Sequence, residues 1–389
     1  MHYFLIAGEA SGDLHASRLI NSLKARDPQA RFTFIGGDKM AAAAGTAPLV
    51  HYSKTAFMGF SEVIRHLGDI MKIMKQTMQW IKEANPGCLI LVDYPGFNLK
   101  IAKKAKKWRR DLPVFYYISP KIWAWKSWRV RKIRKYVDRM FSILPFEKEW
   151  YRKHRYDIDY VGNPSLEEVD AWLSKPYYKA GEAANDHRPD RKAFLESHKL
   201  RDRNIIAILP GSRYGEIKNN LPVMLRAAER FPQCAPVIAL APGIDREFYN
   251  QFAKFLNFTT DTYALLSHAR AALVTSGTAT LETALFGVPQ VVCYRANGSA
   301  ISYHLMKSIL SVKHVSLPNL IVDKEIVPEM LLQYCTPELV GDKLEKLLGE
   351  TSERKEMLEG YGEMRGRLTS SGSLTAPENT AGHIMEALG

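Results

Sequence analysis

The chain has 389 residues, of which 46% are hydrophobic and 24% charged, as in a soluble globular protein with room for two domains. Its 54 Lys and Arg residues outnumber its 41 Asp and Glu residues, giving a formal charge of +13. This excess predicts an anionic partner: nucleic acid, an acidic membrane surface or a phosphorylated substrate. No run of 18 apolar residues occurs, so we expect no membrane-spanning helix.

The cysteines are far apart in the sequence and form no CxxC pair: Cys88, Cys234, Cys293 and Cys335. The 11 histidines show no metal-ligand spacing either. We therefore expect no disulfide, no bound metal and no cofactor, and a reducing cytoplasm as the compartment.

Short apolar runs alternate with helical patterns in the first half of the chain. Helices are predicted between the strands, as at 14–25 and 63–84. The predicted strands are His2–Ala7, Phe32–Ile35, Cys88–Val92, Val114–Ile118, Met140–Ile143 and Ile158–Val161. Because strands alternate with helices, the sequence predicts a parallel sheet with helices on both faces.

The second half repeats this pattern, with predicted strands at Ile205–Leu209, Val237–Ala241, Ala271–Val274 and Gln290–Tyr294. The predicted fold is α/β, with two doubly wound Rossmann-like domains facing across a cleft and ligands at the carboxyl ends of the strands. The predicted divisions are an N-terminal domain 1–173, a polar linker or insertion 174–191, a C-terminal domain 192–350 and a helical tail 351–389. Packing of that tail against the N-terminal domain is one option.

The segment from Ser276 to Glu282 is the strongest candidate for a binding site. It lies between a predicted strand and a predicted helix, and Ser276, Gly277 and Thr278 leave backbone N–H groups free at the helix start, which suits a phosphate group. Glu282, about one turn further on, is placed to accept hydrogen bonds from ribose hydroxyls. An ordinary N-cap is the alternative, although a capping box would need Ser or Thr where Ala279 stands.

A second Gly/Ser loop, Pro210–Glu216, follows the strand Ile205–Leu209 in the same half of the chain. Its Arg213 could contact two phosphate oxygens at once. In a metal-free site it would offset the charge that builds on a leaving diphosphate. The alternative is a turn with a surface arginine.

Two loops of the first half supply further candidates. Asp93 follows the strand Cys88–Val92 and is placed as a general base, or as an Asx-turn residue before Pro95 and Gly96. The glycine loop 8–13 lacks the GxGxxG spacing, but its N–H groups and Ser11 could hold a substrate hydroxyl or phosphate. The signal from this loop is weak.

Three further segments of the first half combine apolar or aromatic residues with cations. The three tryptophans within 119–129 suggest a wall for a sugar or an amphipathic ligand. Basic blocks at 100–110 and 129–135 are solvated faces or anion-binding surfaces. The segment Phe57–Met74 has more apolar residues than one core stripe needs, with cations among them. It fits a helix in a membrane interface or an amphipathic core helix.

Taken in order, these segments resemble the lipid-A-disaccharide synthase family. The matching motifs run collinearly over roughly residues 3–335, and the ordered set is far more specific than any single motif. They are Ala7–Asp13, Met58–Val63, Val92–Asn98, Ser119–Trp125, Leu144–Glu147, Leu209–Arg213, Ser276–Glu282 and Val315–Asn319.

The resemblance implies the glycosyltransferase-B architecture and an inverting transfer without metal. The donor would be UDP-2,3-diacylglucosamine and the acceptor 2,3-diacylglucosamine 1-phosphate, joined by a β-1′,6 linkage with release of UDP. It implies a cytoplasmic protein attached peripherally to the anionic inner face of the cytoplasmic membrane, through Phe57–Met74 and the basic blocks. The implied roles are Asp93 as base, Arg213 with Ser276–Thr278 at the diphosphate, Glu282 at the ribose, and Ser11 and Asn319 lining the cleft.

Two features depart from the family pattern. Asn163 follows Gly162 where many relatives carry His, and the insert around 177–191 is longer and more polar than expected. Rival functions are a peptidoglycan N-acetylglucosaminyltransferase or a UDP-GlcNAc 2-epimerase of the same architecture, and a basic nucleic-acid-binding module. Either rival enzyme would leave the motifs at 8–13 and 119–125 unexplained. The nucleic-acid-binding alternative is disfavoured because the sequence contains no recognised nucleic-acid motif.

Overall fold

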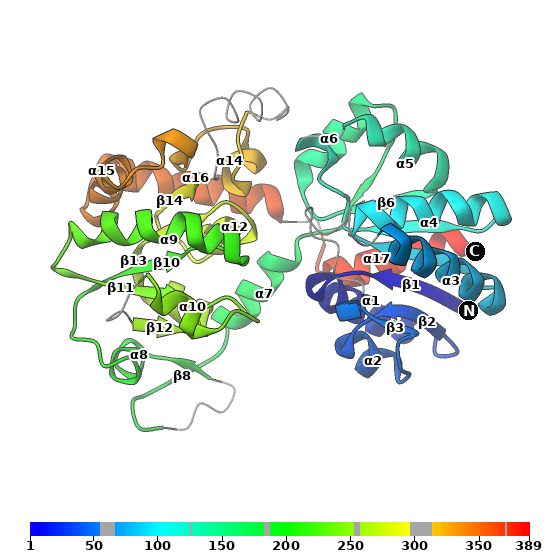
Figure 1. Cartoon of the computed structure of the whole chain (residues 1–389), viewed down its shortest axis with the longest axis horizontal. Coiled ribbons are helices and arrows are strands. Elements are labelled where there is room, and N and C mark those ends of the chain that lie inside the picture. The colour runs from blue at the N-terminus through cyan, green and yellow to red at the C-terminus, as the bar shows by residue number, and fades with distance from the viewer. Residues whose placement is uncertain (55–66, 125–126, 183–186, 253–256, 296–312, 370–371) are drawn as a thin grey trace. The chain divides into compact units, whose positions relative to one another are not determined.

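The computed structural model describes residues 1–54, 67–124, 127–182, 187–252, 257–295, 313–369 and 372–389 (Figure 1). The chain forms two compact units. The first comprises residues 1–164 and returns at 370–389, and the second comprises 165–369.

The first unit contains a seven-stranded parallel sheet with strand order β3-β2-β1-β4-β5-β6-β7. Its strands are β1 (His2–Ala7), β2 (Arg31–Gly36), β3 (Val50–His51), β4 (Cys88–Val92), β5 (Val114–Tyr117), β6 (Arg139–Ser142) and β7 (Asp159–Tyr160). Its helices are α1 (Ala10–Arg26), α2 (Asp38–Ala44), α3 (Leu67–Ala84), α4 (Pro95–Trp108), α5 (Val130–Tyr136), α6 (Pro145–Lys153) and α17 (Ala376–Leu388). Short 3₁₀ turns occur at Tyr52–Lys54 (η1), Ile122–Ala124 (η2) and Ser127–Arg129 (η3).

Helices cover both faces of this sheet, which explains why its central strands are apolar throughout. Along β4, Leu89 and Leu91 belong to the core formed with α3 and α4. The alternate residues Ile90 and Val92 belong to the core formed with α1 and α17. Because successive strand side chains point to opposite faces, β4 is buried on both sides.

The second unit contains a six-stranded parallel sheet with strand order β12-β11-β10-β13-β14-β15. Its strands are β10 (Asn204–Leu209), β11 (Cys234–Ala239), β12 (Asn257–Thr259), β13 (Ala269–Thr275), β14 (Gln290–Tyr294) and β15 (Glu329–Leu331). A separate parallel pair is formed by β8 (Tyr177–Tyr178) and β9 (Arg188–Pro189).

The helices of the second unit begin with α7 (Pro164–Leu173), whose first residue belongs to the first unit. The others are α8 (Arg191–Ser197), α9 (Tyr214–Glu229), α10 (Arg246–Asn250), α11 (Thr262–His268), α12 (Thr278–Leu285), α14 (Leu317–Val322), α15 (Pro337–Leu348) and α16 (Ser352–Leu368). A 3₁₀ turn spans Leu332–Tyr334 (η4).

The predicted α/β class with two Rossmann-like domains is confirmed, but several boundaries differ. The segment 174–191, expected as a linker or insertion, lies inside the second unit and carries β8 and β9. The expected tail divides: α16 belongs to the second unit, whereas α17 packs against α1 in the first. Helix α1 begins at Ala10, so four of the six residues of the glycine loop 8–13 are helical.

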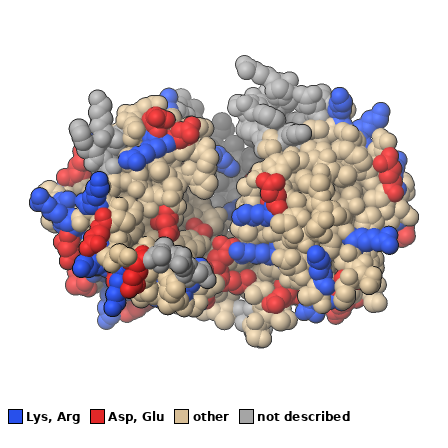
Figure 2. Space-filling model, turned by 90° about the horizontal axis from the view of Figure 1, so that it is seen from below, with Lys and Arg blue, Asp and Glu red and all other residues tan. Residues whose placement is uncertain are grey.

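No helix among the described residues is long and apolar enough to cross a membrane. Residues 57–66 of the predicted interfacial segment lie outside the described residues. Further on, Met74 and Met78 of α3 are buried in the core, whereas Met71 is 69% exposed. On the face drawn in Figure 2, basic and acidic side chains are interspersed.

Candidate functional site

The carboxyl ends of β1 and β4 mark the position where the strand order of the first sheet reverses. Ala7 is paired with Val92 there, so the loops that follow them lie next to each other. A Cβ atom at Gly8 would come within 2.4 Å of the Tyr94 ring, and only glycine allows this close packing. Such a reversal point is where open parallel sheets bind ligands.

Asp93 stands at this point with its backbone fixed. Its φ is +43°, its N–H donates to the Tyr117 carbonyl at 3.0 Å, and its carbonyl accepts from Asn98 Nδ2 at 2.7 Å and from the Tyr116 hydroxyl at 2.5 Å. These bonds hold the main chain of Asp93 without using its carboxylate oxygens. The carboxylate itself accepts a hydrogen bond from the backbone of Tyr94.

Burial raises the pKa of Asp93 to about 6, and the nearby Glu9 charge adds to the rise, while Lys121 opposes it. Burial and the Glu9 charge both disfavour the charged form of the Asp93 carboxylate. A carboxylate with a pKa close to the working pH is suited to accept and release a proton.

Glu147 is a residue of this edge that the sequence did not single out as functional. It is 1% exposed and accepts hydrogen bonds from Ser119 and Ser142, and from Trp123 Nε1 at 2.7 Å. Burial raises its pKa to about 7, against the effect of its hydrogen bonds and of Lys121. Glu147 follows Pro145 in an amphipathic helix, and this local sequence is also typical of a surface glutamate. Only the Leu144–Glu147 motif could have indicated a functional role for it.

Ser11 and Asp13 occupy the first turn of α1. Ser11 is exposed at the edge that also carries Asp93. Asp13 is buried, and its carboxylate accepts the N–H groups of Gly37 (2.7 Å), Lys39 (3.1 Å) and Met40 (3.2 Å). Asp13 therefore secures the start of α2, and Ser11 remains the exposed polar side chain of this turn.

The second unit repeats the arrangement at β10 and β13, where its own strand order reverses. Leu209 is paired with Val274, so the Arg213 loop and the Ser276 loop follow adjacent strands. The Arg213 side chain is 79% exposed, and its Nη1 lies 3.4 Å from Glu216. The same Glu216 carboxylate accepts the N–H of Ser212 at 3.0 Å. Arg213 is therefore lightly tethered and open to an anion.

Helix α12 begins at Thr278 and has no side-chain N-cap, so the ordinary capping alternative does not apply among the described residues. Ser276 instead donates its hydroxyl to the Val315 carbonyl at 3.0 Å. Thr280 donates its hydroxyl to the Gly277 carbonyl at 2.7 Å. The N–H of Thr280 also donates to the Gly277 carbonyl, at 3.2 Å. The N–H groups of Thr278 and Ala279, which come before it, are the ones placed for a ligand of the kind that phosphate supplies.

Glu282 is half-buried one turn into α12, where the Tyr263 hydroxyl donates to its Oε1 at 3.2 Å. Burial raises its pKa, the Tyr263 bond opposes the rise, and the charge of Glu168 adds to it. Phe286 packs beside Tyr263, with ring centroids 5.1 Å apart. The carboxylate is thus held among aromatic rings and keeps further acceptor capacity.

Asn319 differs from the expectation that it lines the substrate site. It is fully buried, its Oδ1 accepts the N–H groups of Ile326 and Val327, and its Nδ2 donates to Val327 and Glu329. All four bonds are 2.8–2.9 Å. Asn163, the departure from the family pattern, is also buried and donates to the Ile143 carbonyl at 2.8 Å. Both asparagines therefore support loops from inside.

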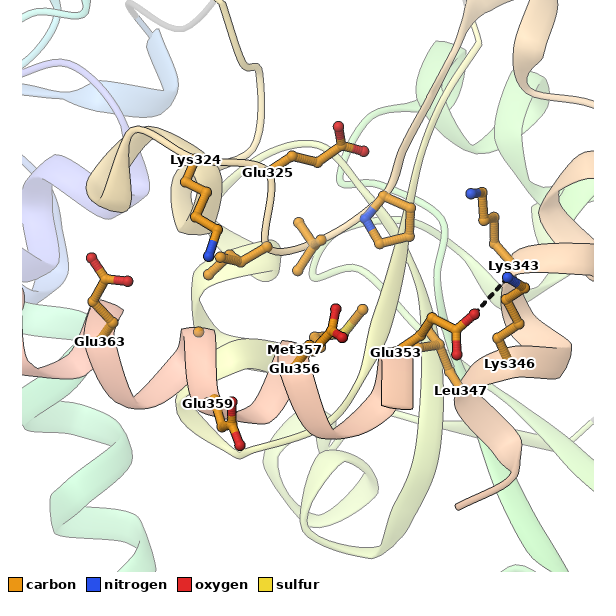
Figure 3. A pocket seen from close by; sticks show the side chains of 14 residues that line it. Lys324, Glu325, Lys343, Lys346, Leu347, Glu353, Glu356, Met357, Glu359 and Glu363 are labelled. Carbon is orange, nitrogen blue, oxygen red and sulfur yellow. Dashed lines mark hydrogen bonds and ion pairs between the residues drawn. The ribbon is translucent and has the colours of Figure 1, made fainter. Parts of the chain in front are cut away.

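A cavity of about 510 Å³ lies in the second unit between α15, α16 and the segment 324–328 (Figure 3). Lysines and glutamates face each other across it, and Lys346 pairs with Glu353 at 2.6 Å. None of its lining residues belongs to the Arg213 or Ser276 loops. Among the described residues, no group of three or more His, Cys, Asp or Glu side chains is arranged to hold a metal ion.

Comparison with solved structures places the fold. The glycosyltransferase of kitacinnamycin matches with a TM-score of 0.62 at 13% identity, over 100% of this chain and 99% of that one. A UDP-GlcNAc 2-epimerase from Neisseria meningitidis, solved with UDP-GlcNAc, matches with a TM-score of 0.61 at 12% identity over the same shares. At these identities the likeness shows a shared two-domain fold alone.

Comparison of sequences places the family. The family model described as lipid-A-disaccharide synthetase matches residues 3–371. The lipid-A-disaccharide synthase of Myxococcus xanthus is 39% identical over 95% of this chain and 94% of the relative. That of Syntrophus aciditrophicus is 38% identical over the same shares. These matches over nearly the whole chain agree with the collinear motifs: the chain belongs to the lipid-A-disaccharide synthase family of glycosyltransferases.

Proposed function

We propose that this glycosyltransferase transfers 2,3-diacylglucosamine from its UDP derivative to the 6-hydroxyl of 2,3-diacylglucosamine 1-phosphate. The products are a β-1′,6-linked disaccharide 1-phosphate and UDP. The observation that carries the proposal is Asp93, which has a fixed backbone and a carboxyl pKa that burial raises to about 6, at the reversal point of the first sheet. The family match supports the choice of substrates.

In the proposed reaction, Asp93 takes the proton of the acceptor 6-hydroxyl as its oxygen attacks the anomeric carbon of the donor. The bond from that carbon to the diphosphate oxygen breaks on the opposite side, so an α-linked donor gives a β-linked product. UDP leaves with the bonding electron pair. A single in-line displacement of this kind needs one base and one stabilised leaving group.

The second unit supplies the groups for the leaving diphosphate. Arg213 is exposed and bears a charge that a phosphate can neutralise. The N–H groups at the start of α12, around Ser276, Gly277 and Thr278, add the positive end of a helix dipole. Glu282 accepts hydrogen bonds from the ribose hydroxyls, and Ser11 contacts the acceptor sugar in the first unit.

The substrates are lipids, so the enzyme works at a membrane. We assign it to the inner face of the cytoplasmic membrane, in peripheral attachment through the segment Phe57–Met74 and the basic blocks. The exposed Met71 of α3 supports this assignment, as does the formal charge of +13 against an anionic lipid surface.

The decisive experiment incubates the protein with both substrates in nonionic detergent and follows UDP and disaccharide together. The proposal expects stoichiometric UDP and a β-configured linkage by NMR, with both products formed far more slowly by Asp93→Asn. Omitting the acceptor measures donor hydrolysis, and UDP-GlcNAc as donor tests the epimerase alternative. Failure to form any disaccharide, or conversion of UDP-GlcNAc at a comparable rate, would overturn it.

A further inference from the structure

The first unit contains a cavity of about 530 Å³ between α3, α4 and the segment from Trp128 to Lys132, here called the α4 groove. Six cations line it: Lys100, Lys103, Lys104, Lys107, Arg129 and Lys132. The four lysines are spaced i, i+3, i+4 and i+7 on α4, so they share one face of the helix. No Asp or Glu is among the described residues that line the groove.

Among the described residues, none of these six cations forms an ion pair with an Asp or Glu. Lys106, on another face of the same helix, pairs with Asp138 at 2.6 Å. The charge of the groove is therefore left for an external anion. Arg129 is half-buried, and this burial lowers the pKa of its guanidinium.

The rest of the wall is apolar. Met74 and Leu99 are buried at its edge, and Trp128 is 56% exposed, with Lys132 Nζ 5.1 Å and Arg129 Cζ 5.7 Å from its ring centroid. Met71, one turn before Met74 on α3, is exposed on the same helix face. A pocket with clustered cations and an apolar wall matches a phosphorylated amphiphile better than a free inorganic ion.

The groove reaches the first turn of α4, which follows the proposed base in the sequence. Pro95 and Gly96, at the first turn of α4, line it and follow Asp93 by two and three residues. A ligand whose anionic end lies along α4 would have its other end near this turn. The position suits the substrate from which Asp93 removes a proton.

We propose that the α4 groove binds the 1-phosphate of the acceptor, with the start of an acyl chain against Met74, Leu99 and Trp128. This inference rests on the proposed function, because it assigns one substrate of that reaction to one surface. In this proposal the groove lysines determine acceptor specificity by binding the acceptor phosphate, and they take no part in the chemical step.

The test compares the double variant Lys100→Gln/Lys104→Gln with the control Lys82→Gln/Lys148→Gln, which removes the same charge from exposed lysines outside the groove. A second groove variant, Lys103→Gln/Lys107→Gln, covers the possibility that the first does not fold. Reactions run in nonionic detergent micelles with the acceptor and with its dephosphorylated form, and the KM of each substrate is measured.

The groove variants should raise the KM of the phosphorylated acceptor by about tenfold or more, since each lost charge-assisted hydrogen bond costs about that factor. The KM of the donor and the KM of the dephosphorylated acceptor should stay near wild type, as should all constants of the control. The preference for the phosphorylated acceptor should therefore shrink.

Wild type that forms no disaccharide would sink the proposed function, whereas active wild type with unchanged acceptor KM in both groove variants would sink this inference alone. Binding to vesicles of phosphatidylglycerol and of phosphatidylcholine tests whether the groove binds the phosphate of a membrane lipid headgroup instead of the acceptor phosphate. Groove variants that lose binding to anionic vesicles but keep the full preference for the phosphorylated acceptor would show that the groove meets the membrane, and the inference would be overturned.

Discussion

Trp123 donates its indole N–H to Glu147 Oε1 at 2.7 Å, and both side chains are at least 95% buried. The bond joins the tryptophan-containing loop after β5 to the first turn of α6 after β6. Ser119 and Ser142 donate to the other carboxylate oxygen. One carboxylate thus fixes a loop whose Lys121 acts electrostatically on both Glu147 and Asp93.

Glu147→Gln should change how stability depends on pH. Burial raises the pKa of Glu147 from 4.5 to about 7, so between those values the folded state binds more protons than the unfolded state. The contribution of Glu147 to the free energy of unfolding therefore falls as pH rises from about 4.5 to 7, by ~3 kcal/mol in total. Urea unfolding at pH 5 and pH 7.5 should show that Glu147→Gln removes this part of the slope.

The matched control is Glu149→Gln on the same helix, whose side chain is 51% exposed. It should leave the slope at its wild-type value. A Glu147→Gln protein with the wild-type pH dependence would mean that Glu147 titrates normally in the folded state.

Asp93→Asn should lower kcat by roughly 10²- to 10⁴-fold if Asp93 is the general base. In wild type, kcat/KM should fall as pH drops below about 6, because the carboxyl group is then protonated. The residual activity of Asp93→Asn should lack this dependence. Isothermal titration with UDP should give wild-type affinity, and a variant within a few-fold of wild-type turnover would exclude Asp93 as the base.

Arg213→Ala should reduce kcat/KM for the donor by about 10²-fold, because the variant lacks the cation that stabilises the negative charge developing on the leaving diphosphate. The side chain is 79% exposed, so the thermal midpoint should not change. Arg201→Ala, another exposed arginine of the second unit, serves as the control and should behave as wild type. Arg213→Lys should recover only part of the activity, because an ammonium group cannot make two parallel hydrogen bonds.

Asn319→Ala should act on stability rather than on substrate binding. It leaves the buried N–H groups of Ile326 and Val327 without their acceptor, which costs about 2–4 kcal/mol in the free energy of unfolding. Denaturant unfolding measures that loss, and Asn250→Ala, at an exposed position of α10, should cost little. A large rise in donor KM with unchanged stability would restore Asn319 as a residue that contacts substrate.

The sequence predicted most of the fold because each central strand is an apolar run bounded by loops. β1, β4 and β14 begin and end at the predicted residues. The strands β3, β12 and β15 were missed, since two or three residues at or near a sheet edge carry no periodic pattern. The polar segment 174–191, predicted as a linker or an insertion, lies inside the second unit, and β8 and β9 pair within it.

The candidate site was predicted unevenly for physical reasons. The positions of Asp93, Arg213 and Ser276 at the carboxyl edges of parallel sheets could be predicted because their loops follow buried strands, whereas their roles stay predictions. Glu147 was missed and Asn319 placed differently because burial and hydrogen-bond partners are set by tertiary packing. Residue type and spacing alone cannot reveal that a glutamate has lost its water or that an amide has four partners inside the protein.

The return of the chain at α17 has a consequence for synthesis. Ala376, Ala381 and Ile384 complete the core on the α1 side of the first sheet, yet the ribosome makes them after the whole second unit. The second unit can therefore acquire its full packing first, while the first waits with the α1 side of its core uncovered. A truncation before α17 should therefore damage the first-made unit rather than the second.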